Sequence, residues 1–322
     1  MEEEKKIVPS VTVKLVTDKP VKKTPYQVKG VFMRQFPDEE IVPMLDGRYR
    51  EKFLYPRVQV KILNEQIYIL GLNEGVESVL SLVEKFDFLD FGNITFQVLG
   101  ADVEKDDNRF RPTNRLIRYR FITPWVALNQ ITGSRYRFLN NAERAVFLNR
   151  LLGQNIVFLA REMGMDIEKK IYTKTSLTSL FPKPVDEHNW GAFTGEFRTN
   201  FILPNYIGVG NGITRGYGTI YGLFNPEMFK FDEGNVDQQE LEDSGVEEIS
   251  KDDTELEAVD VADVPKPRKR RPAAEGPKSP KSPKSRAPRK VLSEEFDIEE
   301  QDDAGEDDRF NRPEFHKKQH DL

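Results

Sequence analysis

The stretch "VQVKILNEQIYILGLNEGVESVLSLV", residues 58–83, decides the fold of the first half of this 322-residue chain. At its start, valine and isoleucine alternate with polar residues, which is the period-two pattern of a half-buried strand. A second apolar run, "QIYILGL", follows after a short turn, so the two runs predict a β-hairpin. A helix is predicted next, because apolar residues recur at helical spacing at Val76, Val79, Leu80 and Val83.

The flanking segments complete this unit. "SVTVKLV" (10–16) alternates like a strand, "KGVFMRQF" (29–36) fits a short helix, and "NITFQVL" (93–99) fits a closing strand. The resulting order of strand, helix, strand, strand, helix and strand is that of a ferredoxin-like (RRM-like) βαββαβ domain. The sequence predicts such a domain over residues 8–105.

A second cycle of the same kind begins at "RLIRYRFI", residues 115–122, where apolar and arginine residues alternate. A helix is expected to follow, with Asn140 as its N-cap and Glu143 completing a capping box. We therefore predict an α+β protein with two ferredoxin-like domains in tandem, the second over residues 106–230. The apolar face of this helix is expected to consist of Leu148, Leu152, Ile156, Leu159 and Met163. The remaining strands of the second domain are expected at "IYTKTSLTSL", "GAFTGEFRTNFIL" and "YGTIYGLF".

The composition changes after residue 230. Residues 1–230 contain 32 Lys and Arg against 27 Asp and Glu, whereas residues 231–322 contain 16 against 27. Large apolar residues are sparse there, so the segment cannot bury enough surface to offset its ordering entropy. We predict that 231–322 is a disordered tail. Its basic run, 266–290, fits either a nonspecific, salt-sensitive RNA tether or a linker without a specific partner.

The chain contains no cysteine, which excludes disulfides and thiolate metal sites. Its first residues, "MEEEKKIVPS", lack the apolar core of a signal peptide, and no run approaches the roughly 20 apolar residues of a membrane span. We expect a cytoplasmic protein that does not associate with membranes.

A glycine-rich stretch, "NYIGVGNGITRGYGTI" (205–220), raises the possibility of an anion site. A dinucleotide-binding loop is excluded because a strand rather than a helix follows, and a P-loop because the Gly-Lys-Ser/Thr ending is missing. A tight, bulged hairpin and a phosphate-binding loop remain, and Arg215 favours the second. The expected RNA-binding residues of this loop are Gly208, Gly210, Gly212, Arg215, Gly216 and Gly218.

Arginine is concentrated just before this loop. Residues 109–150 contain nine arginines and a single acid, Glu143. Arginine forms forked contacts with phosphate, so Arg118 and Arg120 on the predicted strand are expected to bind RNA. The alternative is a set of solvated arginines on strand exteriors. Aromatic residues interleave with them, as single-stranded or hairpin RNA surfaces require, at Tyr119, Trp125, Tyr136 and Phe138.

These residues resemble a known family. "LPNYIGVGNGITRGYGTI" is similar to the carboxy-terminal glycine-rich signature of the CRISPR-associated endoribonucleases that process repeat RNA (pre-crRNA), which belong to the RAMP superfamily. "YPRVQVKI", "LGLNEGVESVLSLVEKF" and "FITPWVALNQ" agree with that family in order, over roughly residues 8–224. The resemblance implies two ferredoxin-like domains, no cofactor, and repeat RNA, commonly a hairpin, as the partner, with a CRISPR effector complex as a further one. It implies cleavage without metal, by attack of a ribose 2′-hydroxyl on the adjacent phosphate.

One feature of the family is missing. Its members usually carry a histidine just before the "YP" motif, but "EEIVPMLDGRYREKFLYP" (39–56) has none. We expect Tyr49 or Lys52 to transfer protons in its place if neighbouring cations lower their pKa, and Arg48 to stabilise charge. The histidines of the chain are His188, His316 and His320, all outside the matching position.

Three functions are therefore open. The first is a metal-independent endoribonuclease, the second a catalytically inactive relative that holds or delivers CRISPR RNA, and the third a scaffold acting through its tail. A metal site is not expected. The densest acidic group, which fits a solvated interdomain loop, comprises Asp102, Glu104, Asp106 and Asp107.

Overall fold

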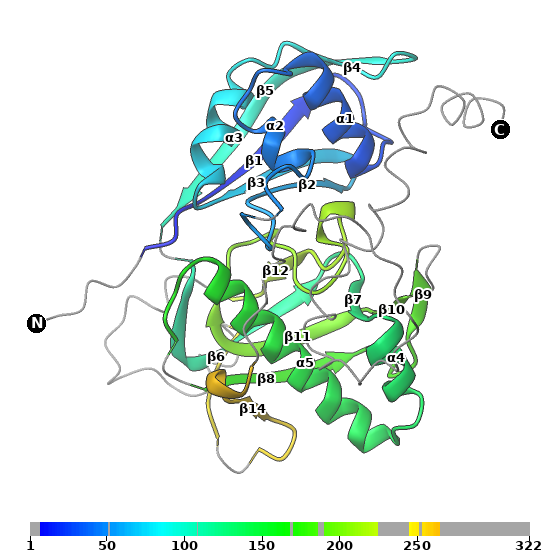
Figure 1. Ribbon diagram of the computed structural model, residues 1–322, viewed down its shortest axis with the longest axis vertical. Coiled ribbons are helices and arrows are strands. Elements are labelled where there is room, and N and C mark those ends of the chain that lie inside the picture. The colour runs from blue at the N-terminus through cyan, green and yellow to red at the C-terminus, as the bar shows by residue number, and fades with distance from the viewer. Residues whose placement is uncertain are drawn as a thin grey trace, which may run out of the picture.

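A computed structural model confirms a mixed α+β chain with two domains, one above the other in Figure 1. No helix in the described part of the chain is long and apolar enough to cross a membrane. The structure describes residues 7–50, 52–107, 109–167, 170–185, 190–224, 245–250 and 253–264.

The N-terminal domain has the predicted ferredoxin-like topology. Its sheet has the order β2-β3-β1-β5-β4, with all neighbours antiparallel. The hairpin predicted from residues 58–72 is β2 and β3, and the helices α1 and α3 cover the side of the sheet that faces away from the second domain (Figure 1). The elements are β1 (Ser10–Thr17), α1 (Pro25–Gln35), α2 (Val42–Leu45), β2 (Val58–Leu63), β3 (Gln66–Leu72), α3 (Gly75–Val83), β4 (Phe88–Asp90) and β5 (Thr95–Asp106).

The C-terminal domain keeps the ferredoxin-like strand order in its main sheet, β12-β6-β11-β8, but lacks the second helix. The glycine-rich stretch with the short 3-10 turn η1 (Ile213–Arg215) stands between β11 and β12 instead. A smaller sheet has the order β7-β10-β9. The other elements are β6 (Arg111–Phe121), β7 (Trp125–Leu128), α4 (Gln130–Tyr136), α5 (Asn141–Glu162), β8 (Ile171–Leu177), β9 (Lys183–Val185), β10 (Trp190–Phe193), β11 (Gly195–Ile202) and β12 (Ile220–Gly222).

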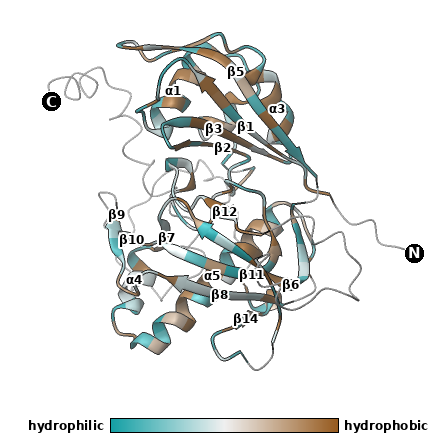
Figure 2. Cartoon of the chain, turned by 180° about the vertical axis from the view of Figure 1, so that it is seen from behind, coloured by the Kyte–Doolittle hydropathy of each residue, from teal (hydrophilic) through white to brown (hydrophobic). Residues whose placement is uncertain are grey.

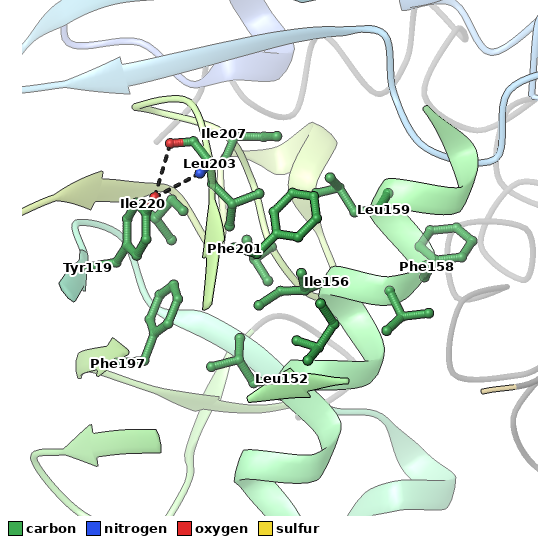
Figure 3. Close-up of a cluster of buried hydrophobic side chains, with 14 of the residues drawn as sticks. Tyr119, Leu152, Ile156, Phe158, Leu159, Phe197, Phe201, Leu203, Ile207 and Ile220 are labelled. Carbon is green, nitrogen blue, oxygen red and sulfur yellow. Dashed lines mark hydrogen bonds between the residues drawn. The ribbon is translucent and has the colours of Figure 1, made fainter. Parts of the chain in front are cut away.

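Helix α5 begins as predicted. The Asn140 side chain accepts from the backbone N–H of Glu143, and the Glu143 carboxylate accepts from the N–H of Asn140. The predicted apolar face is buried against the inward side of the sheet (Figure 3). Tyr119 of β6 belongs to this core, where its hydroxyl accepts from the N–H of Leu203 at 2.7 Å.

Two local predictions were wrong. Residues 191–203 form two strands rather than one. The strand is interrupted at Gly195 (φ +145°), where the chain passes from the small sheet to the main sheet. Three members of the predicted acidic loop, Asp102, Glu104 and Asp106, instead belong to the end of β5, which pairs with β1, and Asp107 follows the strand. Charges of this group form ion pairs, including those of Arg109 with Glu104 (3.3 Å) and Asp106 (2.9 Å).

The predicted disordered tail contains structured residues. Strands β13 (Val246–Glu248) and β14 (Glu257–Val259) pair with β6 and β8, and the turn η3 (Val261–Asp263) follows. The prediction from composition was wrong here because three valines, each at most 5% exposed, pack into a core formed by the rest of the chain. They are Val246, Val259 and Val264. The rest of the predicted tail, 231–244, 251–252 and 265–322, lies outside the described residues.

Candidate nucleic-acid interface

Buried polar side chains of the first domain hold the glycine-rich loop. Gln59 of β2 is 1% exposed, and its side-chain oxygen accepts from the N–H of Gly208 at 2.9 Å. The Tyr55 hydroxyl donates to the carbonyl of Gly208 at 2.6 Å and accepts from the Gln59 amide at 2.9 Å. Both backbone groups of Gly208 are therefore satisfied across the domain junction.

Lys61 makes a second contact of this kind. Its side chain is fully buried, and its Nζ donates to the carbonyl of Ile213 in η1 at 3.2 Å. An ammonium group is costly to bury without hydrogen-bond partners. The carbonyl of Ile213 is such a partner, so the buried ammonium of Lys61 depends on the loop backbone. The face of the N-terminal sheet that is not covered by α1 and α3 is thus an interface with the loop.

Arg57, directly before β2, contacts the end of α5. Its guanidinium donates to the carbonyl of Glu162 at 2.6 Å and to the Glu74 carboxylate at 2.7 Å. Burial opposes ionisation of Glu74, but a backbone hydrogen bond and the Arg57 charge outweigh it, so the pKa of Glu74 lies below its usual value. Glu74, between β3 and α3, therefore helps to position a buried arginine at the domain junction.

The amides of the glycine-rich loop donate within the protein. The N–H of Gly218 donates to Pro124, that of Gly216 to Ile213, and that of Gly208 to Gln59. In this conformation these three amides do not form the predicted phosphate cradle.

Glycine is required at two positions of the loop because of φ angles and close packing. At Gly218 (φ +64°) a Cβ would overlap the carbonyl oxygen of Val209. At Gly210 (φ +90°) it would come 2.6 Å from Nε1 of Trp125. Gly212 (φ +68°) precedes η1, and its carbonyl accepts from the N–H of Arg215. The loop is a compact structural unit, as the bulged-hairpin interpretation expects.

Arg215 presents its side chain beside this unit. Its guanidinium lies 4.7 Å from the ring centroid of Trp190 on β10. Stacking on an aromatic ring fixes the orientation of a guanidinium. Trp190, which β10 brings to this position, was not predicted from the sequence.

Arg118 and Arg120 share one carboxylate. Arg118 lies 2.6 Å and Arg120 2.7 Å from the Glu196 oxygens, with all three side chains on the main sheet's outward face. Burial opposes ionisation of Glu196, but hydrogen bonds from the two arginines outweigh it and hold the pKa of Glu196 below its usual value. The two arginines remain 39% and 59% exposed, so solvent reaches both.

The predicted aromatic surface is mostly core. Tyr119, Trp125 and Tyr136 are at most 2% exposed, and only Phe138, at 89%, faces solvent. The period-two pattern of β6 explains this error, because its arginines face outward and Tyr119 therefore faces the core. Exposed aromatics occur elsewhere, since Tyr221 of β12 lies beside Arg120 in the sheet.

The segment expected to carry catalysis follows α2. The Arg48 guanidinium pairs with Asp46 at 2.6 Å, and the Lys52 ammonium lies 5.2 Å from the centroid of the Tyr49 ring. Tyr49 is 36% exposed. The segment leads directly to Tyr55, so the structure places it next to the contact between the two domains.

The described residues contain no group of three or more His, Asp or Glu able to hold a metal ion. His188, His316 and His320 all lie outside the described residues.

Comparison with protein families decides the relationship. The model of the Cas6b N-terminal domain matches residues 6–109, and that of the Cas6b C-terminal domain matches residues 111–223. The chain belongs to the Cas6b family. The two Cas6b domains meet between β5 and β6, and the segment with β13 and β14 lies outside both matches.

Solved structures of the same family are similar to this chain over both domains. A crystal structure of Cas6b is 28% identical, with a TM-score of 0.58, and covers 67% of this chain and 100% of its own. A second, described as CRISPR RNA processing endoribonuclease Cas6b, is 26% identical with a TM-score of 0.52 and the same coverage. Among curated proteins, an uncharacterised protein of Methanocaldococcus jannaschii is 26% identical over 125 residues, which are 39% of this chain and 85% of that one.

Proposed function

We propose that this Cas6b protein binds CRISPR repeat RNA and cleaves it by metal-independent attack of a ribose 2′-hydroxyl. The observation that carries the proposal is the likeness to a Cas6b described as a CRISPR RNA processing endoribonuclease, which spans both family domains of this chain and the whole of that structure. RNA is the partner that this likeness supports, and a CRISPR effector complex is a further proposed partner.

The RNA-binding part of the proposal rests on side chains rather than on loop amides. Arg118, Arg120 and Arg215 present guanidinium groups on one domain, and each is oriented by a neighbouring carboxylate or ring. Forked donors held in this way suit phosphate oxygens. The glycines Gly208, Gly210, Gly212, Gly216 and Gly218 allow the backbone path that brings Arg215 to Trp190.

For catalysis we propose Tyr49, Lys52 and Arg48. Attack by a 2′-hydroxyl requires a base near it, a donor to the leaving 5′-oxygen, and positive charge near the phosphate. The phenol of Tyr49 and the ammonium of Lys52 are adjacent and reach solvent beside the domain junction, and Arg48 supplies a guanidinium. In the complex, Arg48 would exchange Asp46 for the scissile phosphate.

The test is a cleavage assay with labelled repeat RNA in a chelator, beside the same RNA with 2′-deoxyribose at the cut site. We expect cleavage of the first RNA only. Tyr49→Phe is expected to slow cleavage by about 100-fold or more without weakening binding, as loss of a general acid or base does. Tyr172→Phe on β8, which removes a phenol from the other domain, serves as the control.

A second function is favoured by one observation. The segment 39–56 contains no histidine, unlike the family members that this chain resembles. If the protein binds repeat RNA tightly and cuts neither RNA, it is a noncatalytic Cas6b that holds or delivers CRISPR RNA. If it does not bind the RNA, both functions are wrong.

A further inference from the structure

Three cations stand in direct register across the outward face of the C-terminal sheet. Arg198 of β11 lies opposite Arg118 of β6 on one side and opposite Lys174 of β8 on the other. Directly opposite residues share a face, and neighbouring strands are about 4.8 Å apart, so the row spans about 10 Å. Like charges opposite each other destabilise a sheet unless anions lie between them. Figure 2 shows the three strands side by side.

The sheet supplies little of the required negative charge. Glu196 binds Arg118 and the neighbouring Arg120, while Arg198 and Lys174 take their carboxylates from outside the matched family domains. Glu247 of β13 pairs with Arg198 at 2.6 Å. Asp253 and Glu255 pair with Lys174 at 2.9 and 3.0 Å, and these contacts raise the pKa of Lys174.

These carboxylates are not needed to attach their segment. Val246 and Val259 are buried on either side of them, and both strands pair with the sheet. Partly exposed ion pairs add little stability. The three carboxylates are therefore arranged to neutralise the row at small structural cost, as phosphates of a bound strand would.

We propose that the row Arg118–Arg198–Lys174 is a phosphate-binding surface for RNA, and that Glu247, Asp253 and Glu255 occupy it when RNA is absent. The partner is the sugar–phosphate backbone of the RNA, so this inference rests on the proposed function. RNA must displace the carboxylates, which lowers its affinity and limits binding to strands that also reach other contacts.

The test compares the full chain with the variant Glu247→Gln/Asp253→Asn/Glu255→Gln by fluorescence anisotropy. The probe is repeat RNA made with 2′-O-methyl riboses, which cannot be cleaved by 2′-hydroxyl attack. We expect about tenfold tighter binding at low salt. Two newly available cations should also steepen the slope of log Kd against log salt concentration by about 1.4 for a single strand.

A matched control removes the same charge elsewhere. Glu77, Glu84 and Asp87 lie exposed on and after α3 in the other domain. Their triple amide variant is expected to change the affinity less than twofold. Arg198→Gln/Lys174→Gln should weaken binding about tenfold in the carboxylate-free variant and much less in the unaltered chain, because only the first presents these cations.

Equal affinity of the carboxylate variant and the unaltered chain would overturn the inference and leave the proposed function standing. An equal gain by the control would do the same, since it would show a general charge effect. Absence of RNA binding by every protein would overturn both. Thermal melting verifies folding, and Glu247→Gln alone, whose expected gain is smaller, replaces the triple variant if that variant is unfolded.

Discussion

At the scale of the residue, Gly218 shows how closely the glycine-rich loop is packed. Its φ of +64° is unfavourable for other residues, and a side chain would overlap the carbonyl of Val209. Its N–H donates to Pro124, and its carbonyl accepts from Val209. Glycine at this position therefore serves the path of the chain, and the loop's contribution to RNA binding comes from Arg215.

We expect Gly218→Ala to lower the free energy of unfolding by about 3 kcal/mol or more, because strain and overlap add. The control is Gly30→Ala in α1, where nothing lies within 4 Å of the new Cβ. It should raise the free energy of unfolding by about 0.5–1 kcal/mol, as alanine does in a helix. Urea denaturation measures both, and equal effects would contradict the packing described for Gly218.

At the scale of the element, the glycine-rich loop occupies the chain position of the second helix in the C-terminal domain. A helix satisfies its own backbone groups, whereas this loop has groups satisfied by the other domain, through Gln59 and Lys61 of β2 and Tyr55 just before that strand. Polar contacts thereby couple the loop that carries Arg215 to β2 and to Tyr55 just before it.

Gln59→Met tests this coupling. The substitution leaves the N–H of Gly208 buried without its acceptor, which should cost about 1–3 kcal/mol of unfolding free energy. Gln97→Met, on the exposed side of β5, is expected to cost less than 0.5 kcal/mol. Amide hydrogen exchange of the loop should speed up in the first variant only. Unchanged exchange there would show that the loop does not depend on β2.

At the scale of the whole molecule, two Cas6b domains are extended by a segment that adds one strand on each side of the C-terminal sheet. β13 lies beside β6 and β14 beside β8, and Arg161 of α5 donates to the carbonyls of Val261 and Val264. An acidic part of the chain thus lies against a basic sheet. The charge difference between residues 1–230 and 231–322 has a structural counterpart here.

Ending the chain after Phe224 should therefore destabilise it. The burial of Val246, Val259 and Val264 would be lost, and each buried valine contributes about 1.5 kcal/mol or more. We expect the free energy of unfolding to be lower than that of the full chain by about 4 kcal/mol or more. A chain ending at Val264 keeps these contacts and should match the full chain within about 1 kcal/mol. Equal stability of all three chains would mean that the segment only rests on the surface.

The two-domain fold follows from the sequence because its signals are local. The alternation in β2 and β6, the helical spacing in α3 and α5, and the capping box at Asn140 each depend on residues a few positions apart. The same alternation, read strictly, would have placed Tyr119 in the core. The family resemblance added the function, which no local pattern in this chain specifies.

Only the tertiary structure decided which charged and hydrogen-bonding groups contact one another. Tyr55 and Gly208 are 153 residues apart, and Glu247 reaches Arg198 only because β13 pairs with β6. Burial of three valines outweighed a tail composition typical of disorder, since their binding surface is made by other parts of the chain. Sequence alone determined most elements of the two domains and their order. Contacts between distant residues determined the site, because an ion pair or a buried hydrogen bond depends on positions in space.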